Sequence, residues 1–150
     1  MGEKTDCFSN NGFFVVKCGK NWLLLQVLHS ESVPAVFVRT DEPLEYIHED
    51  KENKSSGTLK ISEDGETMLE TDFKHIKGRG NSTWNYDKKS YNLKFDDKVD
   101  FLGMAAAKKW ALIASYLDPT LIRNAFGFEL AEEMGIDYAS EYRPADLYVN

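Results

Sequence analysis

A basic stretch of the chain, residues 74–98, contains the residue types that bind anions. It carries seven positive and three negative side chains, a net charge of +4, whereas the whole chain has a net charge of −7. Within it, Gly78, Arg79 and Gly80 are followed by small polar side chains. Because glycine admits positive φ and has no Cβ, such a loop lets backbone N–H groups approach a phosphate. The pattern indicates an anion-binding loop, with a plain glycine turn or a lysine-protected strand edge as the alternatives.

The residues after this loop alternate with a period of two, which predicts a β-strand. One face carries Lys89, Tyr91, Leu93 and Phe95, and the opposite, solvent-facing set is Lys88, Ser90, Asn92 and Lys94. Lys89 therefore leads an apolar face, where its ammonium group could reach an anionic ligand at the edge of the sheet. The alternative is that its alkyl stem covers Tyr91 while its charge stays in water.

A strand and a helix are expected further along the chain. Residues 109–116 are apolar enough for a buried strand. Asp118 and Pro119 then supply an N-cap and a first helical residue, and Gly135 supplies a stop, which predicts a helix from Pro119 to Met134.

Glu129 stands out on this predicted helix. On a helical wheel it falls among Ile122, Ala125 and Phe126. A carboxylate inside an apolar stripe is costly unless it is paired, so we expect Lys89 or Arg79 as its partner. The alternative is an exposed glutamate on an imperfect stripe.

The remaining elements position these residues within a sheet. Turn residues and β-branched or apolar runs predict a hairpin over residues 12–28, a strand over 33–40 and a loop with one helical turn over 41–57. A second hairpin is predicted for 58–61 with 68–73, because Asp64-Gly65 is a hairpin turn signal. The last predicted strand, within 143–150, is cut short. We expect the hairpin in residues 1–32 either to pack on the rest of the chain or to be the tail of a preceding module, and the main domain to begin at residue 33.

Composition bounds the class of protein. The chain has 150 residues, of which 42% are hydrophobic and 29% charged, so it should fold, either as one ordinary domain or as one small domain with an appendage. No apolar run approaches the roughly 18 residues of a membrane span, and no signal peptide is visible. The negative net charge argues against nucleic acid as a partner. Cys7 and Cys18 are too few for a zinc site, and a disulfide and two free thiols both stay open.

Several motifs together resemble the N-terminal part of the spore coat protein H (CotH) kinase-like family. The resemblance runs from about Val33 to Asn150, in order and with family-like spacing, and leaves out residues 1–32. It is carried by Lys77–Trp84, Lys88–Tyr91, Phe101–Met104, Lys108–Trp110 and Leu121–Asn124.

The resemblance implies an α+β fold, with an antiparallel sheet and one main packed helix, like the smaller lobe of an atypical protein kinase. It implies ATP and Mg²⁺ as cofactors and Ser or Thr of secreted or spore-surface proteins as the phosphorylated groups. It also places nucleotide-binding roles on Arg79, Gly80, Asn81, Ser82, Lys89 and Glu129, with Lys88 and Glu132 as alternatives to the last two. In kinases a lysine holds the α and β phosphates and a helix glutamate holds that lysine.

No segment of the chain matches the family's catalytic aspartate or its metal-binding Asn and Asp. We therefore expect no catalytic or metal-binding residue here, a truncated domain, and no phosphoryl transfer by this chain alone. A second class of function stays open, a noncatalytic protein- or carbohydrate-binding module of a secreted bacterial surface protein. For that module, Trp84, Tyr86 and Tyr116 are the candidate sugar-stacking residues.

Overall fold

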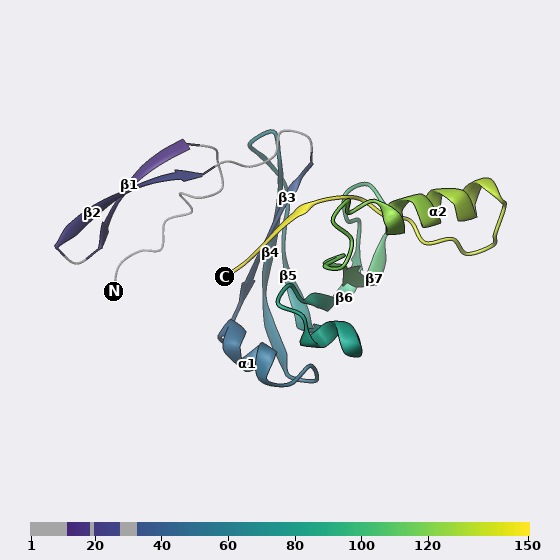
Figure 1. The fold of residues 1–150 in the computed structure, drawn as a ribbon, viewed down its shortest axis with the longest axis horizontal. Helices are drawn as coiled ribbons and strands as arrows, with labels where there is room; N and C mark the ends of the chain where they lie inside the picture. Colours follow the sequence, from purple (N-terminus) through teal and green to yellow (C-terminus); the bar gives the residue numbers. More distant parts are fainter. Residues whose placement is uncertain (1–11, 19, 28–32) are drawn as a thin grey trace.

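The computed structural model describes residues 12–18, 20–27 and 33–150. The N-terminal hairpin is confirmed, since β1 (Gly12–Cys18) and β2 (Asn21–Val27) pair as an antiparallel two-stranded sheet. A six-stranded sheet with the order β7-β6-β5-β4-β3-β8 forms the rest (Figure 1). Cys7 and the side chain of Cys18 lie outside the described residues, and so does the question of their pairing.

The fold is α+β, as expected from the resemblance. The strands of the large sheet are β3 (Ala35–Thr40), β4 (Lys54–Glu63), β5 (Glu66–Arg79), β6 (Ser90–Val99), β7 (Ala107–Leu112) and β8 (Asp146–Val149). The helices are α1 (Leu44–Glu49), α2 (Arg123–Glu133) and the 3₁₀ helix η1 (Ser82–Asn85). Every strand pair in the large sheet is antiparallel except β3 with β8, so the sheet is mixed.

The Asp-Gly turn between β4 and β5 forms where the sequence predicts it. Asp64 and Gly65 both have positive φ, 51° and 82°. Two positive φ values twist the chain in the sense that the two strands require, and Asp-Gly is the pair that adopts them most easily. Both strands extend well beyond the predicted hairpin.

A bulge in β5 brings two large side chains to the same face. Ser55 of β4 is opposite Ile76, and Gly57 is opposite Phe73, so β5 contains one extra residue between these pairs. This extra residue shifts the alternation by one position. As a result Phe73 and Ile76 are both buried, at 3% and 0% exposure.

The core lies on one face of the sheet. Tyr91, Leu93 and Phe95 of β6 are buried, which confirms the predicted alternation. The core cluster consists of Val36, Val38, Ile47, Leu59, Ile61, Phe73, Ile76, Tyr91, Leu93, Phe95, Phe101 and Met104. Ile47 comes from α1, which makes α1 the helix that packs into this core.

The start of α2 and the end of β7 differ from the prediction. β7 ends at Leu112 rather than Tyr116, and α2 begins at Arg123 rather than Pro119. Ser115 and Leu121 have positive φ, 47° and 60°. Neither residue fits a regular strand or helix in that conformation, so the chain between β7 and α2 is an irregular connection.

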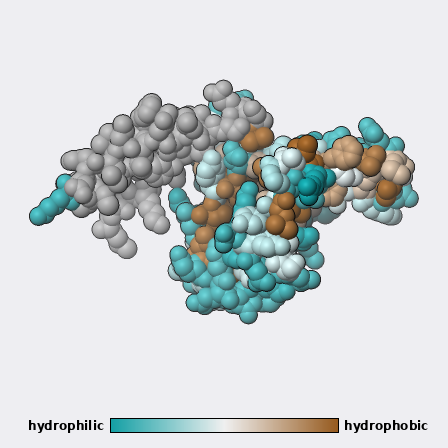
Figure 2. Space-filling model, viewed as in Figure 1, coloured by the Kyte–Doolittle hydropathy of each residue, from teal (hydrophilic) through white to brown (hydrophobic). Residues whose placement is uncertain are grey.

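The longer helix, α2, extends to one side of the sheet (Figure 1) and contains no buried residue. Apolar side chains line it at every fourth position, namely Ile122, Phe126, Leu130 and Met134, with 61%, 67%, 42% and 68% exposure. Figure 2 shows hydrophobic residues gathered along this helix. No helix in the described part of the chain is long and apolar enough to cross a membrane.

Candidate functional site

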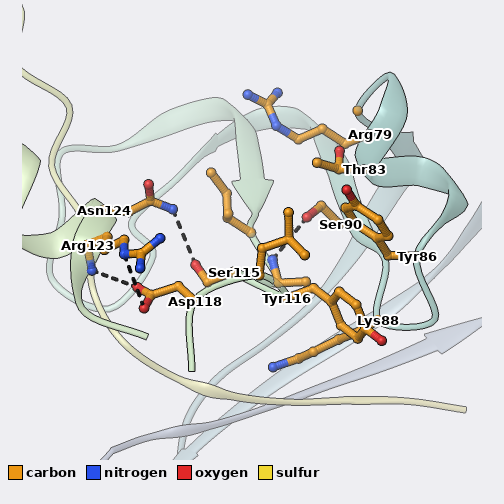
Figure 3. Close-up of a pocket in the computed structure, with 14 residues that line it drawn as sticks. Arg79, Thr83, Tyr86, Lys88, Ser90, Ser115, Tyr116, Asp118, Arg123 and Asn124 are labelled. Atoms are coloured by element: carbon orange, nitrogen blue, oxygen red, sulfur yellow. Dashed lines mark hydrogen bonds and ion pairs between the residues drawn. The ribbon is translucent and has the colours of Figure 1, made fainter. Parts of the chain in front are cut away.

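A hollow of about 290 Å³ lies where two connections of the large sheet meet. One connection joins β5 to β6 and contains the glycine loop, and the other joins β7 to α2. The hollow is lined by Arg79, Gly80, Thr83, Tyr86, Lys88, Ser90, Ile113, Ala114, Ser115, Tyr116, Leu117, Asp118, Arg123 and Asn124 (Figure 3).

The glycine loop has a conformation that only glycine accommodates at Gly80. Its φ is +112°, and a Cβ added there would lie 2.1 Å from Oγ1 of Thr83. The chain then enters η1, where the N–H of Trp84 donates to the carbonyl of Asn81 at 3.2 Å. At Gly78 a Cβ would lie 2.6 Å from the ring of Trp84, so this glycine lets the ring pack against β5. The two glycines thus bring the loop close to its own strand.

Hydrogen bonds hold the second connection against β6 and α2. The N–H of Ala114 donates to Oγ of Ser90 at 3.0 Å, and Nδ2 of Asn124 donates to Oγ of Ser115 at 3.2 Å. Figure 3 shows Ser115 between Asn124 and Ser90. Hydroxyl and amide groups from β6, the connection and α2 therefore share one wall of the hollow.

Asp118 organises the start of α2, although the helix begins five residues later. Its Oδ1 accepts from Oγ1 and N of Thr120 at 2.6 and 3.1 Å, and its Oδ2 accepts from the N–H of Arg123 at 2.8 Å. The hydroxyl of Thr120, followed by the N–H of Arg123, lowers the pKa of this buried carboxyl group. The predicted N-cap position was therefore wrong, because Ile122 is the N-cap, although Asp118 still accepts from the first N–H of the helix across a turn.

Three cationic side chains line the hollow, against the single carboxylate of Asp118. Arg79 comes from the end of β5 and Arg123 from the start of α2, and Figure 3 shows them on opposite sides of the hollow. Lys88 comes from the loop before β6 and lies beside Tyr116. Asp118 offsets one of these charges, since Nε of Arg123 lies 3.7 Å from its Oδ1, so three cations against one carboxylate leave the lining of the hollow positive.

Lys89, the lysine expected to bind phosphate, has a different set of contacts. Its Nζ donates to the carbonyls of Trp84 and Tyr86 at 2.7 and 3.2 Å, and it lies 4.7 Å from the centre of the Trp84 ring. Lys89 is not among the residues that line the hollow, whereas its alternative Lys88 is. Lys89 therefore holds the loop closed on itself.

Glu129 does not contact either of the cationic partners expected from the helical wheel, Lys89 and Arg79. Glu129 is exposed, and its Oε1 accepts from the hydroxyl of Tyr142 at 2.8 Å. That contact raises the pKa of Tyr142. The expectation of a pair with Lys89 or Arg79 was wrong because α2 leaves its apolar side exposed, so Glu129 is not desolvated. Glu132 is also exposed on α2.

The other predicted residues lie at the glycine loop. Nη1 of Arg79 donates to Oδ1 of Asn92 at 2.9 Å. Asn81 and Ser82 are exposed at the start of η1, and Nζ of Lys51 lies 3.5 Å from both Oδ1 of Asn81 and the carbonyl of Gly80. The structure therefore brings Arg79 and Gly80 together in the hollow, with Asn81 and Ser82 next to them in the chain.

Sequence reasoning assigned no role to Arg123, Asn124 or Ser115, which share this hollow. Arg123 and Asn124 belong to a segment that supported the family resemblance, and that was the available signal. Ser115 carried none, because its position depends on how the connection after β7 turns. Among residues 12–18, 20–27 and 33–150, no group of three or more acidic, histidine or cysteine side chains is arranged to hold a metal ion.

The fold and the hollow together define a class, an α+β protein with a cationic, glycine-lined loop at one end of its sheet. The comparison with family models makes the class specific. The model of the CotH kinase protein family matches residues 76–150, half of the chain, and this chain belongs to that family. Neither a curated protein nor a solved structure matches the chain.

Proposed function

We propose that this chain contributes the phosphate-binding part of a CotH-type protein kinase. In this proposal Mg²⁺-ATP is the phosphate donor, and Ser or Thr of secreted or spore-surface proteins receives the phosphate. The single observation that carries the proposal is the hollow that Arg79, Lys88 and Arg123 share with Gly80. Its support is chemical, because phosphate oxygens favour charge-assisted hydrogen bonds and backbone that approaches without a Cβ.

The residues take distinct roles in this proposal. Lys88, Arg79 and Arg123 neutralise phosphate charge, and Gly80, Asn81 and Ser82 shape the loop around it. Lys89 is a positioning residue, since its contacts to Trp84 and Tyr86 fix the loop. Glu129 takes no part in holding the lysine.

An aromatic surface at the hollow suits the base of a nucleotide. The rings of Tyr86 and Tyr116 stack with their centres 5.2 Å apart, and Tyr116 is 46% exposed. An exposed aromatic face accepts a planar base by stacking. We propose that this pair distinguishes a nucleotide from inorganic phosphate.

The proposal assigns binding, rather than phosphoryl transfer, to these residues. The transfer needs a group to orient the hydroxyl and groups to hold metal ions, and the family pattern places those on other motifs. The cationic lining of the hollow suits a phosphate. The described residues offer no cluster of ligands for Mg²⁺, so no step through the metal is assigned to them.

The alternative function, a noncatalytic sugar- or protein-binding module, draws on Trp84, Tyr86 and Tyr116. The ring of Trp84 is occupied by Lys89 on one side and lies edge-on to His48. Tyr86 and Tyr116 stack on each other, so one face of each ring is covered. These contacts reduce the aromatic surface for a base and for a sugar alike. The nucleotide is the better-supported ligand because three cations, Arg79, Lys88 and Arg123, line the hollow, and a neutral sugar has no charge for them to bind.

Calorimetric titration with Mg²⁺-ATP tests the proposal. We expect Lys88→Gln to weaken binding by about tenfold, the loss of one charge-assisted contact. Lys98→Gln is the matched control, because Lys98 is an exposed lysine of β6 outside the hollow. If wild type and Lys88→Gln bind Mg²⁺-ATP with equal affinity, the hollow is not the nucleotide site. If the protein binds a neutral oligosaccharide and not ATP, the alternative function is favoured.

A further inference from the structure

A second hollow, of about 550 Å³, lies on the sheet face opposite the core. We call it the basic groove, and it is lined by Lys54, His75, Lys77, Arg79, Asn92, Leu93, Lys94, Lys109, Trp110 and Ala111. These residues come from four adjacent strands, β4 to β7. Five of them carry a full positive charge and none is acidic, in a chain whose net charge is −7.

The strand register places like charges directly opposite each other in the basic groove. Lys54 of β4 is the partner of Lys77 in β5, and Lys94 of β6 is the partner of Lys109 in β7. Like charges in opposed positions destabilise an antiparallel pair. Two such pairs on one face destabilise the fold, and an anion bound between them would offset that cost.

Few carboxylates relieve this charge. Lys77 pairs with Glu52 at 2.6 Å at one end of the basic groove, and Asp96 pairs with Lys74 outside it. Within the described residues, no ion pair joins Lys54, Lys94 or Lys109 to a carboxylate. Burial, and then the charges of Lys54 and Lys94, lower the pKa of His75, which lines the same groove.

The extent of the basic groove defines the size of a fitting anion. Four strands spaced about 4.8 Å apart span about 14 Å, the length of roughly four extended residues. Beyond it, on the same face, β4 and β5 present the pairs Thr58–Asp72 and Lys60–Glu70, where acidic side chains return. The complementary ligand is therefore a short run of negative charges rather than a long polyanion.

The aromatic content of the basic groove argues against a nucleic acid. Its tryptophan, Trp110, is half-buried, with its ring 5.1 Å from that of Phe101 and its Nε1 donating to the carbonyl of Ala107. Proteins that bind single strands use free aromatic rings as stacking platforms for the bases. An acidic polypeptide needs only cations at regular spacing, and this face has them.

We propose that the basic groove docks a short acidic segment of another polypeptide, with its negative groups supplied by Asp and Glu or by phosphoserine. Both sources place several anions on a short extended chain, within reach of the long, flexible lysine side chains. The inference does not rest on nucleotide binding, because Lys94 and Lys109 do not line the hollow proposed for ATP.

Fluorescence anisotropy with three labelled octapeptides tests the docking site: one rich in Asp and Glu, one with phosphoserines and one neutral. At low salt we expect one or both acidic peptides to bind, and K94Q/K109Q to weaken that binding by about fivefold or more. The matched control K60Q/K98Q removes the same charge from β4 and β6 outside the basic groove and should bind like wild type. The ratio between the two acidic peptides identifies the source of the anions.

Three results would overturn the proposal: no binding of either acidic peptide at low salt, equal loss of binding in K94Q/K109Q and K60Q/K98Q, or a single-stranded oligonucleotide that binds more tightly than both peptides. The thermal midpoint shows that the variants fold. For K94Q/K109Q it should rise or stay level, because the substitution removes a repulsive cross-strand pair. Mg²⁺-ATP binding should be unchanged in this variant, which separates the basic groove from the nucleotide site.

Discussion

Gly80 determines the shape of the loop that lines the proposed phosphate site. At its φ of +112° a residue with a side chain is strained, and a Cβ would collide with the hydroxyl of Thr83. We predict that Gly80→Ala lowers the free energy of unfolding by about 1–3 kcal/mol, the usual cost of one strained backbone position. The same change should weaken Mg²⁺-ATP binding, because the loop must move to relieve the contact.

Urea unfolding measures this effect against Gly127→Ala. Gly127 lies inside α2 with nothing within 4 Å of an added Cβ. Alanine favours a helix interior over glycine, so this control should stabilise the protein by about 0.5–1 kcal/mol. If Gly80→Ala proves as stable as wild type, the loop does not have the conformation described.

At single residues, the sequence predicted which side chains of β6 are buried but not which groups Lys89 contacts. Alternation along β6 correctly predicted that Tyr91, Leu93 and Phe95 are buried, because burial with a period of two is a local property of a strand. It could not predict that Lys89 turns back onto the carbonyls of Trp84 and Tyr86, since that contact depends on the path of the loop.

At the scale of elements, the two helices differ in how the sheet holds them. α1 places Ile47 in the core with no exposed surface, whereas α2 leaves Ile122, Phe126, Leu130 and Met134 exposed. An apolar stripe of this kind on a protein surface favours association. The sequence predicted an apolar stripe of Ile122, Ala125 and Phe126, which shares only Ile122 and Phe126 with the exposed one. The expectation of one main packed helix was wrong for α2, because none of its residues is buried and the ring of Phe128 lies against that of Tyr142, 5.8 Å away.

We predict that the double variant F126S/M134S lowers self-association of the protein with little change in stability. Both side chains are about two-thirds exposed, at 67% and 68%, so their removal leaves no cavity. Sedimentation velocity over a range of concentrations measures the association. As a reference, Ile47→Ala should cost about 2–5 kcal/mol because it empties a core position. A comparable loss in F126S/M134S would contradict an exposed α2.

Element boundaries were predictable where turn residues determine them. Asp64-Gly65 located the β4–β5 turn, and the helix stop near Gly135 was close, because these depend on local φ. The start of α2 was not predictable. Asp118 binds the N–H of Arg123 across a turn with Leu121 at positive φ, and no local pattern distinguishes this from capping by the preceding residue.

At the scale of the whole molecule, two histidines make stability depend on pH. Burial, and then a nearby lysine, lowers the pKa of His48 below its ordinary value of 6.5, and burial and four lysines do the same for His75. The unfolded chain therefore takes up protons below about pH 6.5 that the folded protein does not, so stability falls as the pH falls through this range.

Thermal midpoints between about pH 7.5 and about pH 5.5 test this sign. We expect the midpoint to fall toward the acidic end, and His75→Gln to reduce the slope while leaving the Tyr91–His48 hydrogen bond of 2.7 Å intact. The pKa values of Glu52, Asp96 and Asp118 are also lowered, so these groups add a further loss of stability only as the pH falls below their ordinary values of 4.5 for Glu and 3.8 for Asp. A midpoint that rises on acidification would contradict the assigned directions.

The distribution of charge unites the two proposed sites. A chain with a net charge of −7 concentrates cations at the glycine loop and on the adjacent sheet face, and Arg79 lines both hollows. The basic stretch was visible in the sequence. Its division into a hollow and a groove was not, because it depends on which strands pair and in which register.

Amide chemical-shift mapping by NMR during a titration with Mg²⁺-ATP tests the central claim most directly. We predict that the largest shifts fall at Gly80, Lys88, Ser115 and Arg123, the residues of the hollow from both connections. Lys88→Gln should reduce these shifts, and Lys98→Gln should not. Shifts confined to the strands of the basic groove, or absent altogether, would contradict the account of the phosphate site.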